Sequence, residues 1–157
     1  MIKLLMVCMG NLCRSPMAQM VTLQMARQAG MAHEIKVDSA GTRASPRKEP
    51  TDPRANAVLS GHGYALVKHK SRLVTERDFS RYDLILAMDR ENLHDLMRIC
   101  PTDQTHRLRL FLEFAEEVGL HEVPDPYYGG IVGFERVLDL CEAGARGLLD
   151  RLQNSPP

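Results

Sequence analysis

The sequence predicts an α/β fold, in which helices cover both faces of a parallel sheet. Short apolar runs alternate along the chain with segments that carry apolar residues at helical spacing, the order typical of strand–helix–strand units. The first run, Ile2 to Val7, has almost no polar alternation, as expected of a strand covered on both faces. No repeat, low-complexity tract or linker interrupts the chain, so we expect residues 1–157 to form a single domain.

Three further apolar runs are expected to be strands. They extend over Glu34 to Ser39, Asp83 to Met88 and Arg107 to Leu112. Because ligands of such folds bind at the carboxyl ends of the strands, a functional site is predicted just after Val7.

The expected helices have recognisable starts, ends and apolar faces. Ser15 is predicted to be an N-cap, with Pro16 at the first helical position and Gly30 at the end of that helix. Asp52-Pro53 repeats the signal and starts a helix that runs to about Gly61. Apolar residues at helical spacing predict two more helices. They are Leu93, Leu96, Met97 and Cys100 before Pro101, and then Phe134, Val137, Leu138, Cys141, Ala145, Leu148, Leu149 and Leu152.

The composition argues against several classes of partner. Twenty basic residues balance twenty acidic ones, so the net charge gives no reason to expect nucleic-acid binding. No apolar run is long enough to span a bilayer and the first residues lack a signal-peptide layout, so we expect no membrane insertion. Four scattered cysteines are too few for a disulfide scaffold, which favours a cytoplasmic, reducing location.

The segment after the first strand has the pattern of a phosphate-binding loop. Cys8 is followed by five residues and then Arg14, between a strand and a predicted helix. The N–H groups of such a loop can point inward at a tetrahedral anion, and the helix N-terminus adds its positive dipole end. Arg14 can grip two phosphate oxygens with its planar fork. The same positive features favour the thiolate of Cys8, which is a nucleophile, and Ser15 can donate to its sulfur.

Two alternatives for this segment are weaker. A cysteine, five residues and an arginine also occur by accident, as a buried cysteine and a solvated arginine in an ordinary loop. The preceding strand, the Ser-Pro that follows and the internal Gly-Asn favour the phosphate loop. Zinc binding fits less well, because Cys8 and Cys13 are separated by four residues and no second Cys or His pair follows.

These residues resemble a known family. Residues 7–16, Val-Cys-Met-Gly-Asn-Leu-Cys-Arg-Ser-Pro, are similar to the signature loop of the low-molecular-weight protein tyrosine phosphatases. The similarity continues, in family order and spacing, through residues 38–42, 52–54, 69–72, 82–89 and 124–128. The resemblance implies a four-stranded parallel sheet in the order 2-1-3-4, a phosphocysteine intermediate at Cys8, and neither a metal nor another cofactor.

The resemblance also implies roles for individual residues. Phosphate binding would involve the loop residues Met9, Gly10, Asn11, Leu12, Cys13, Arg14 and Ser15. Ser39 and His69, with Asn11, would hold the shape of the loop by hydrogen bonds, and Asp89 would orient the loop. The second cysteine of the loop resembles a thiol that forms a reversible disulfide with the oxidised nucleophile.

A phosphatase of this kind needs an acid as well as a nucleophile, because the phenolate that leaves from phosphotyrosine is a strong base. Asp125 lies in a proline-stiffened segment with Tyr127 and Tyr128. From the residues alone, a catalytic acid and a helix cap are equally good interpretations of Asp125. The resemblance favours catalysis, with Asp125 as the acid and the two tyrosines as walls of the substrate cleft.

The predicted rim of the cleft departs from the family pattern at one position. Ser45 stands where the family usually has an aromatic residue, and Pro46, Arg47 and Lys48 follow it. We expect Ser45 and Leu12 to border the substrate, with a rim that is more basic than usual.

The expected function is therefore the hydrolysis of phosphotyrosine in proteins, with inorganic phosphate and vanadate as inhibitors. An arsenate reductase on the same fold would need two more redox cysteines, and residues 82–92 contain none. An arginine phosphatase of the family tends to have threonine at the position of Leu12. A phosphate-sensing module without turnover is disfavoured because Cys8, Arg14 and Asp125 are all present.

Overall fold

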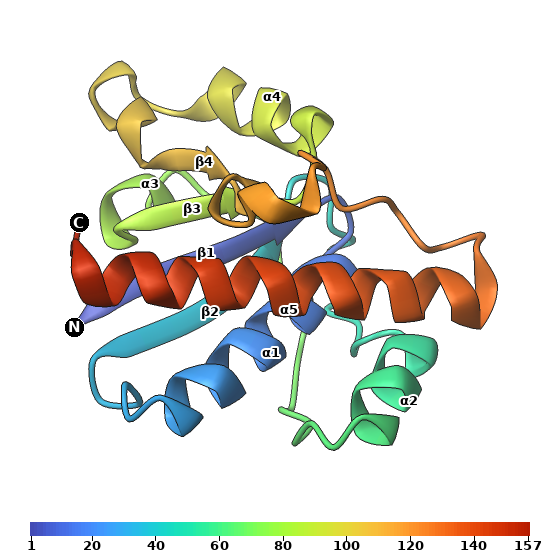
Figure 1. Cartoon of the computed structure of the whole chain (residues 1–157). Coiled ribbons are helices and arrows are strands. Elements are labelled where there is room, and N and C mark those ends of the chain that lie inside the picture. Colours follow the sequence, from blue (N-terminus) through green and yellow to red (C-terminus); the bar gives the residue numbers. More distant parts are fainter.

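Four parallel strands form one sheet in the order β2-β1-β3-β4. The computed structural model describes residues 1–157, and Figure 1 shows helices on both sides of the sheet. The strands are β1 (Ile2–Cys8), β2 (Ile35–Gly41), β3 (Leu84–Ala87) and β4 (Leu108–Leu110). The predicted fold class, the parallel pairing and the strand order are confirmed.

The register brings the carboxyl ends of three strands together. Cys8 of β1 pairs with Gly41 of β2, and Val7 pairs with Ala87 of β3. The loop that follows β1 and the residues that follow β3 therefore meet at one edge of the sheet. The two chain termini lie at the opposite end of the molecule (Figure 1).

Helices cover both faces because the side chains of β1 alternate between two cores. Leu4 and Met6 belong to the larger core, beneath α1, α2 and α5. Leu5 and Val7 belong to the smaller core, beneath α3 and α4. The helices are α1 (Arg14–Gln28), α2 (Pro53–Gly61), α3 (Asp78–Arg81), α4 (Arg90–Ile99) and α5 (Gly130–Asn154), with the 3-10 helices η1 (Thr102–Arg107), η2 (Phe111–Phe114) and η3 (Glu116–Val118).

The predicted cap of α2 is confirmed and that of α1 is wrong. Asp52 accepts a hydrogen bond from the Arg54 backbone N–H at 2.8 Å, with Pro53 at the first helical position. By contrast, α1 begins at Arg14, one residue before the predicted cap, and no side chain caps it. Ser15 therefore lies inside the first turn, and its hydroxyl is free for another partner.

Two other expectations are corrected. The predicted strand at 107–112 is only three residues long, because the chain turns into η2 at Phe111. The Glu113 carboxylate of η2 accepts hydrogen bonds from Arg109 Nε (2.6 Å) and from the Leu110 N–H (3.4 Å). The predicted helix before Pro101 does not include Cys100: α4 ends at Ile99, and Cys100 stands at its C-cap position, half-buried against the smaller core.

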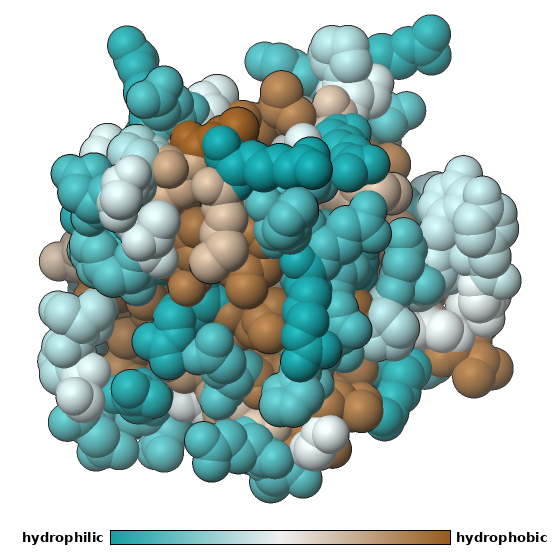
Figure 2. All heavy atoms as spheres, turned by 90° about the horizontal axis from the view of Figure 1, so that it is seen from above, coloured by the Kyte–Doolittle hydropathy of each residue, from teal (hydrophilic) through white to brown (hydrophobic).

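Polar side chains cover most of the face that is seen from the side of α4, and apolar atoms are exposed between them (Figure 2). The exposed apolar residues of α4 itself are Met97 and Ile99. No helix of the structure combines the length and the apolar character needed to cross a membrane.

Candidate active site

The loop between β1 and α1 carries hydrogen-bond donors that the rest of the chain does not use. None of the backbone N–H groups from Gly10 to Ser15 donates a hydrogen bond within the chain. Cys8, at the end of β1, and Arg14, at the start of α1, are each only 3% exposed. A row of free N–H groups beside a helix N-terminus is a binding site for a tetrahedral anion such as phosphate.

Asn11 holds this loop in shape from its centre. Its φ of 60° lies in the left-handed region, which a non-glycine residue adopts only with support from its surroundings. Asn11 Nδ2 donates to Ser15 Oγ (2.8 Å) and Ser39 Oγ (3.0 Å), and Asn11 Oδ1 accepts from the Arg72 N–H (2.9 Å). His69 Nε2 donates to the Asn11 carbonyl at 2.8 Å; burial lowers the pKa of His69, and the neutral ring makes this bond with its proton on Nε2.

The hydroxyl of Ser15 lies next to the sulfur of Cys8. The Cys8 Sγ and Ser15 Oγ atoms are 3.0 Å apart, whereas the competing carbonyl of Ala40 is 3.4 Å away. Because Ser15 Oγ already accepts from Asn11, its single proton is left to donate. A thiolate at Cys8 is the stronger acceptor of the two, and donation to it stabilises the negative sulfur.

Strand β2 supports the same loop through Gly41, which lies in segment 38–42 and had no expected role of its own. A Cβ at Gly41 would lie 2.6 Å from the Met9 carbonyl oxygen and 3.0 Å from the Asn11 nitrogen. The next residue, Thr42, donates its N–H to the Cys8 carbonyl at 2.9 Å. This close approach of backbone to backbone requires glycine.

Arg14 is held by groups from two distant segments. Its Nη1 donates to Asp89 Oδ2 at 2.6 Å and to the Val123 carbonyl at 3.0 Å, and its Nη2 lies 3.9 Å from Asp125 Oδ2. Burial disfavours the charge on the guanidinium, but attraction to Cys8 and then Asp89 outweighs it, so the pKa of Arg14 is raised. The guanidinium is therefore a fixed positive charge beside the loop.

Asp125 reaches the site on the segment between η3 and α5. Its side chain is 45% exposed; its Oδ1 accepts from the Tyr127 N–H at 3.0 Å, and its Oδ2 faces Arg14. Helix α5 begins only at Gly130, with Gly129 at its N-cap position. Asp125 therefore does not cap this helix, which removes the alternative interpretation of its role.

The residues expected around the mouth of the site are more exposed. Tyr127 and Tyr128 pack edge to face with ring centroids 4.9 Å apart, and they are 49% and 95% exposed. Ser45 is half-buried and its hydroxyl accepts from the Arg47 N–H at 3.2 Å. Leu12 is also half-buried and packs partly against the larger core.

Two polar side chains at the site had no expected role, although Arg54 lies in segment 52–54, which resembles the family. Gln19 accepts a hydrogen bond from Ser39 Oγ at 2.7 Å and so supports the partner of Asn11. Arg54 donates to the Tyr127 carbonyl at 2.8 Å. A glutamine on a helix and an arginine after a capping Asp-Pro are ordinary in sequence, and only the fold shows their partners.

These features together define a class of protein. A buried sulfur, a row of free N–H groups and a buried arginine lie at the carboxyl edge of a parallel sheet, with a carboxylate 3.9 Å from the arginine. Such a site can bind a phosphate group and can supply both a nucleophile and an acid. No group of three or more His, Cys, Asp or Glu side chains is arranged to hold a metal ion. The fold and the site are those of a cysteine-dependent phosphohydrolase.

Comparisons with known proteins agree with this class. The family described as low molecular weight phosphotyrosine protein phosphatase matches residues 3–156. A low molecular weight protein-tyrosine-phosphatase of Streptomyces coelicolor is 44% identical over 146 residues, which are 91% of this chain and 88% of that protein. Two solved structures match 100% of both chains. They are a protein tyrosine phosphatase of Entamoeba histolytica with Hepes in its active site (TM-score 0.95, 36% identity) and a low molecular weight phosphotyrosine phosphatase of Vibrio cholerae (TM-score 0.93, 40% identity).

The chain belongs to the low molecular weight phosphotyrosine protein phosphatase family. It is a cysteine-dependent phosphatase of the protein tyrosine phosphatase class. The family resemblance of the phosphate loop and the later motifs is thereby confirmed.

Proposed function

We propose that Cys8, Arg14 and Asp125 carry out the two chemical steps of this phosphatase. In the first step the Cys8 thiolate attacks phosphorus: the S–P bond forms, the P–O bond to tyrosine breaks, and Asp125 gives its proton to the leaving oxygen. In the second step water attacks phosphorus, Asp125 takes a proton from that water, and the S–P bond breaks. Inorganic phosphate leaves, and the thiolate and the protonated acid are restored.

The surroundings of Cys8 carry this proposal. A hydroxyl lies 3.0 Å from its sulfur, and the N–H groups of the following residues have no acceptor in the chain. The hydroxyl of Ser15 supports the thiolate as nucleophile in the first step and as leaving group in the second. The N–H groups and Arg14 stabilise the charge that spreads over the phosphate oxygens in both steps.

Asp125 is suited to move a proton because its two oxygens have different surroundings. Oδ1 accepts the Tyr127 N–H, whereas Oδ2 has only the Arg14 Nη2 at 3.9 Å. The second oxygen is therefore available to a leaving group or a water molecule. The exposure of the side chain also lets the water molecule of the second step reach it.

On the substrate side, we propose that the loop from Met9 to Ser15 binds the phosphate group and that inorganic phosphate and vanadate compete for it. The free N–H groups of the loop support this role. We further propose that Leu12, Ser45, Tyr127 and Tyr128 border the phenyl ring, which is supported by the position of the tyrosines on the same segment as Asp125.

Three broader features remain proposals. The one-domain organisation of residues 1–157 is supported by two cores that share one sheet. A cytoplasmic location is supported by four cysteines that are all free thiols. Redox control through a disulfide is supported by the position of Cys8 and Cys13 in the same short loop.

Two variants test the chemical roles. Cys8→Ser is expected to lose turnover of aryl phosphates and still to bind vanadate, because the N–H groups and Arg14 remain. Asp125→Asn is expected to slow hydrolysis by roughly 10²- to 10⁴-fold for poor leaving groups and less for activated ones. Cys100→Ser, far from the loop in sequence, is the control and should keep full activity. More than a few per cent activity in Cys8→Ser would exclude Cys8 as the nucleophile.

A further inference from the structure

We propose that Arg54 is a positioning residue that holds the segment of Asp125 against the phosphate loop, so that one oxygen of Asp125 stays directed at the leaving group. This inference rests on the role proposed for Asp125 as the acid. Arg54 touches neither phosphate-binding group nor reacting atom; it acts through Asp52 and Tyr127.

The first half of the connection joins Arg54 to the phosphate loop. Its Nε donates to Asp52 Oδ1 at 3.1 Å and its Nη2 donates to Asp52 Oδ2 at 2.9 Å, a two-pronged pair that fixes the plane of the guanidinium. The Asp52 N–H in turn donates to the Leu12 carbonyl at 2.9 Å. The hydrogen bond from Arg54 is the main cause that lowers the pKa of Asp52, so this pair stays charged at neutral pH.

The second half joins Arg54 to the segment of the acid. The remaining guanidinium nitrogen, Nη1, donates to the Tyr127 carbonyl at 2.8 Å. The guanidinium also lies over the Tyr127 ring at 5.3 Å from its centroid and over the Phe134 ring of α5 at 4.8 Å. Arg54 thus uses its three nitrogens and its contacts with two aromatic rings to connect α2, the acid segment and the start of α5.

The connection ends on one oxygen of Asp125. The Tyr127 N–H donates to Asp125 Oδ1 at 3.0 Å, so the residue whose carbonyl Arg54 holds also holds this oxygen. The other oxygen, Oδ2, is then the one that faces Arg14 and the phosphate loop. Pro126 between them is buried, so packing holds the backbone of this segment. The side chains of Asp125 and Tyr127 are each about half exposed, so their orientation depends on hydrogen bonds, and Arg54 supplies one of these.

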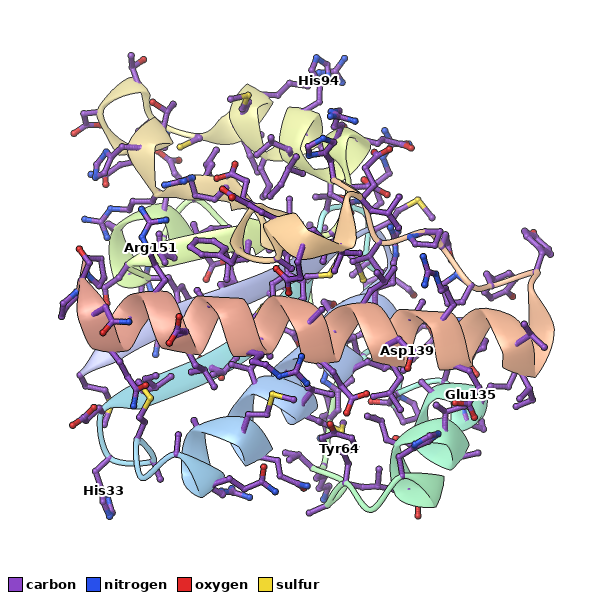
Figure 3. The ribbon with its side chains drawn as sticks, viewed as in Figure 1. His33, Tyr64, His94, Glu135, Asp139 and Arg151 are labelled. Carbon is purple, nitrogen blue, oxygen red and sulfur yellow. The ribbon has the colours of Figure 1, made fainter.

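Helix α2 is a suitable support for this anchor because a second contact also ties it to α5. His62, which follows α2, and Glu135 of α5 approach to 2.8 Å between Nε2 and Oε2. In Figure 3 Glu135 lies on the side of α5 that faces α2. The Arg54 contact is therefore made from the start of a helix whose other end is also tied to α5.

The test compares Arg54→Met with Arg54→Lys and with a matched control, Arg98→Met, in which an exposed arginine without a hydrogen bond in the chain is replaced. The readouts are kcat/KM over a series of aryl phosphates with increasingly basic leaving groups, and the affinity for vanadate. A misplaced catalytic group can cost on the order of 10²-fold. We therefore expect Arg54→Met to slow poor leaving groups by roughly 10- to 100-fold and activated ones by less than about 3-fold.

Three further expectations separate positioning from a general structural role. Vanadate affinity should stay within about 3-fold of wild type, because Arg54 does not touch the phosphate-binding groups. In an Asp125→Asn background, Arg54→Met should produce no further selective slowing, since the two residues act through the same proton transfer. Arg54→Lys keeps the charge and loses the two-pronged geometry, so its kcat/KM for poor leaving groups should lie between those of wild type and Arg54→Met. If Arg54→Met does not fold, Arg54→Lys is compared with wild type in its place.

Each contrary outcome has a distinct meaning. Equal slowing over the whole series together with weaker vanadate binding would show that Arg54 merely maintains the phosphate loop, and would overturn the inference. Selective slowing by Asp125→Asn but none by Arg54→Met or Arg54→Lys would overturn the role of Arg54 and leave the proposed acid intact. If Asp125→Asn lowers kcat/KM equally for all aryl phosphates of the series, Asp125 is not the acid, and the positioning role of Arg54 is overturned with it.

Discussion

Leu12 lies in the phosphate loop between two buried residues, and its half-buried side chain is apolar. Such a side chain packs well on a phenyl ring but offers no hydrogen-bond partner to a guanidinium group. Polar N–H groups that are buried without partners cost ~1–3 kcal/mol each. We therefore expect phosphotyrosine peptides to be hydrolysed faster than phosphoarginine peptides of the same sequence.

The measurement is kcat/KM for the two peptides with wild type, Leu12→Met and Leu12→Thr. Leu12→Met keeps an apolar side chain and should preserve the preference for phosphotyrosine. Leu12→Thr places a hydroxyl at the same position and should narrow the preference. Faster turnover of phosphoarginine by the wild-type enzyme would contradict this account of specificity.

Cys13, the second cysteine of the loop, is a poor source of thiolate. Burial, and then the charges of Asp52 and Cys8, raises the pKa of Cys13 to about 12. Its thiolate, which must attack the oxidised Cys8, becomes about tenfold scarcer for each pH unit below this value. We expect peroxide to inactivate the enzyme reversibly through a Cys8–Cys13 disulfide that forms faster as pH rises from about 7 to about 9.

Peptide mapping of the oxidised enzyme should find this link, and a thiol reductant should restore activity. Cys13→Ser should lose that recovery, whereas Cys100→Ser should retain it. Over-oxidised Cys8 without a disulfide, in enzyme that a thiol does not reactivate, would count against the prediction.

At the scale of the elements, α5 depends on a close approach to η2. The Phe114 carbonyl lies so near Gly147 of α5 that an added Cβ would overlap it. The guanidinium groups of Arg109 and Arg151 both lie over the Phe114 ring, at 5.7 Å and 5.9 Å from its centroid. Figure 3 shows Arg151 on the part of α5 near the carboxyl end of the chain, away from the phosphate loop. The Phe114 carbonyl is part of the backbone and cannot move aside as the end of a flexible side chain would.

Gly147→Ala is therefore expected to destabilise the fold by about 1–3 kcal/mol through overpacking. Gly61→Ala at the end of α2 is the matched control, because nothing lies within 4 Å of its added Cβ, and it should change stability by less than about 1 kcal/mol. Urea unfolding measures both. Specific activity below the transition should be unchanged in Gly147→Ala, and equal stability of the two variants would show that α5 and η2 can separate at no cost.

At the scale of the whole molecule, alkaline pH acts on buried acids that keep their protons only in the folded state. Burial, and then the 2.6 Å hydrogen bond to Asp38, raises the pKa of Tyr82 from 10.0 to about 12. Burial also raises the pKa of Cys13 from 9.0 to about 12. Between the ordinary and the raised values the unfolded chain holds fewer protons than the folded chain, so the free energy of unfolding falls as pH rises.

We expect Tyr82→Phe to weaken the pH dependence of the free energy of unfolding, because phenylalanine has no proton to lose. The slope of unfolding free energy against pH should become shallower by up to about 1.4 kcal/mol per pH unit between about pH 10 and about pH 12. The loss of the hydrogen bond to Asp38 should cost about 1 kcal/mol at about pH 8. Tyr128→Phe, at an almost fully exposed position, should leave both the slope and the stability unchanged. A wild-type slope in Tyr82→Phe would show that this tyrosine ionises equally in both states.

The sequence by itself determined the features whose causes lie within a few neighbouring residues. The strand, loop and helix around Cys8 and Arg14 were predictable from local apolar runs and turn residues, and so was the Asp52-Pro53 cap. The apolar face of α5 was predictable from its helical spacing. The order of the strands was not local in this sense and came from the family resemblance, because no short pattern records which strands pair.

Only the tertiary structure decided the contacts between distant segments. The Ser-Pro pair favours an N-cap locally, yet the Ser15 hydroxyl is engaged by Cys8 and Asn11, and the helix starts one residue earlier. Arg14 meets Asp89 and Val123, which lie 75 and 109 positions away along the chain. Such bonds form only after strand pairing has brought the carboxyl ends of β1 and β3 together, and local propensity holds no information about them.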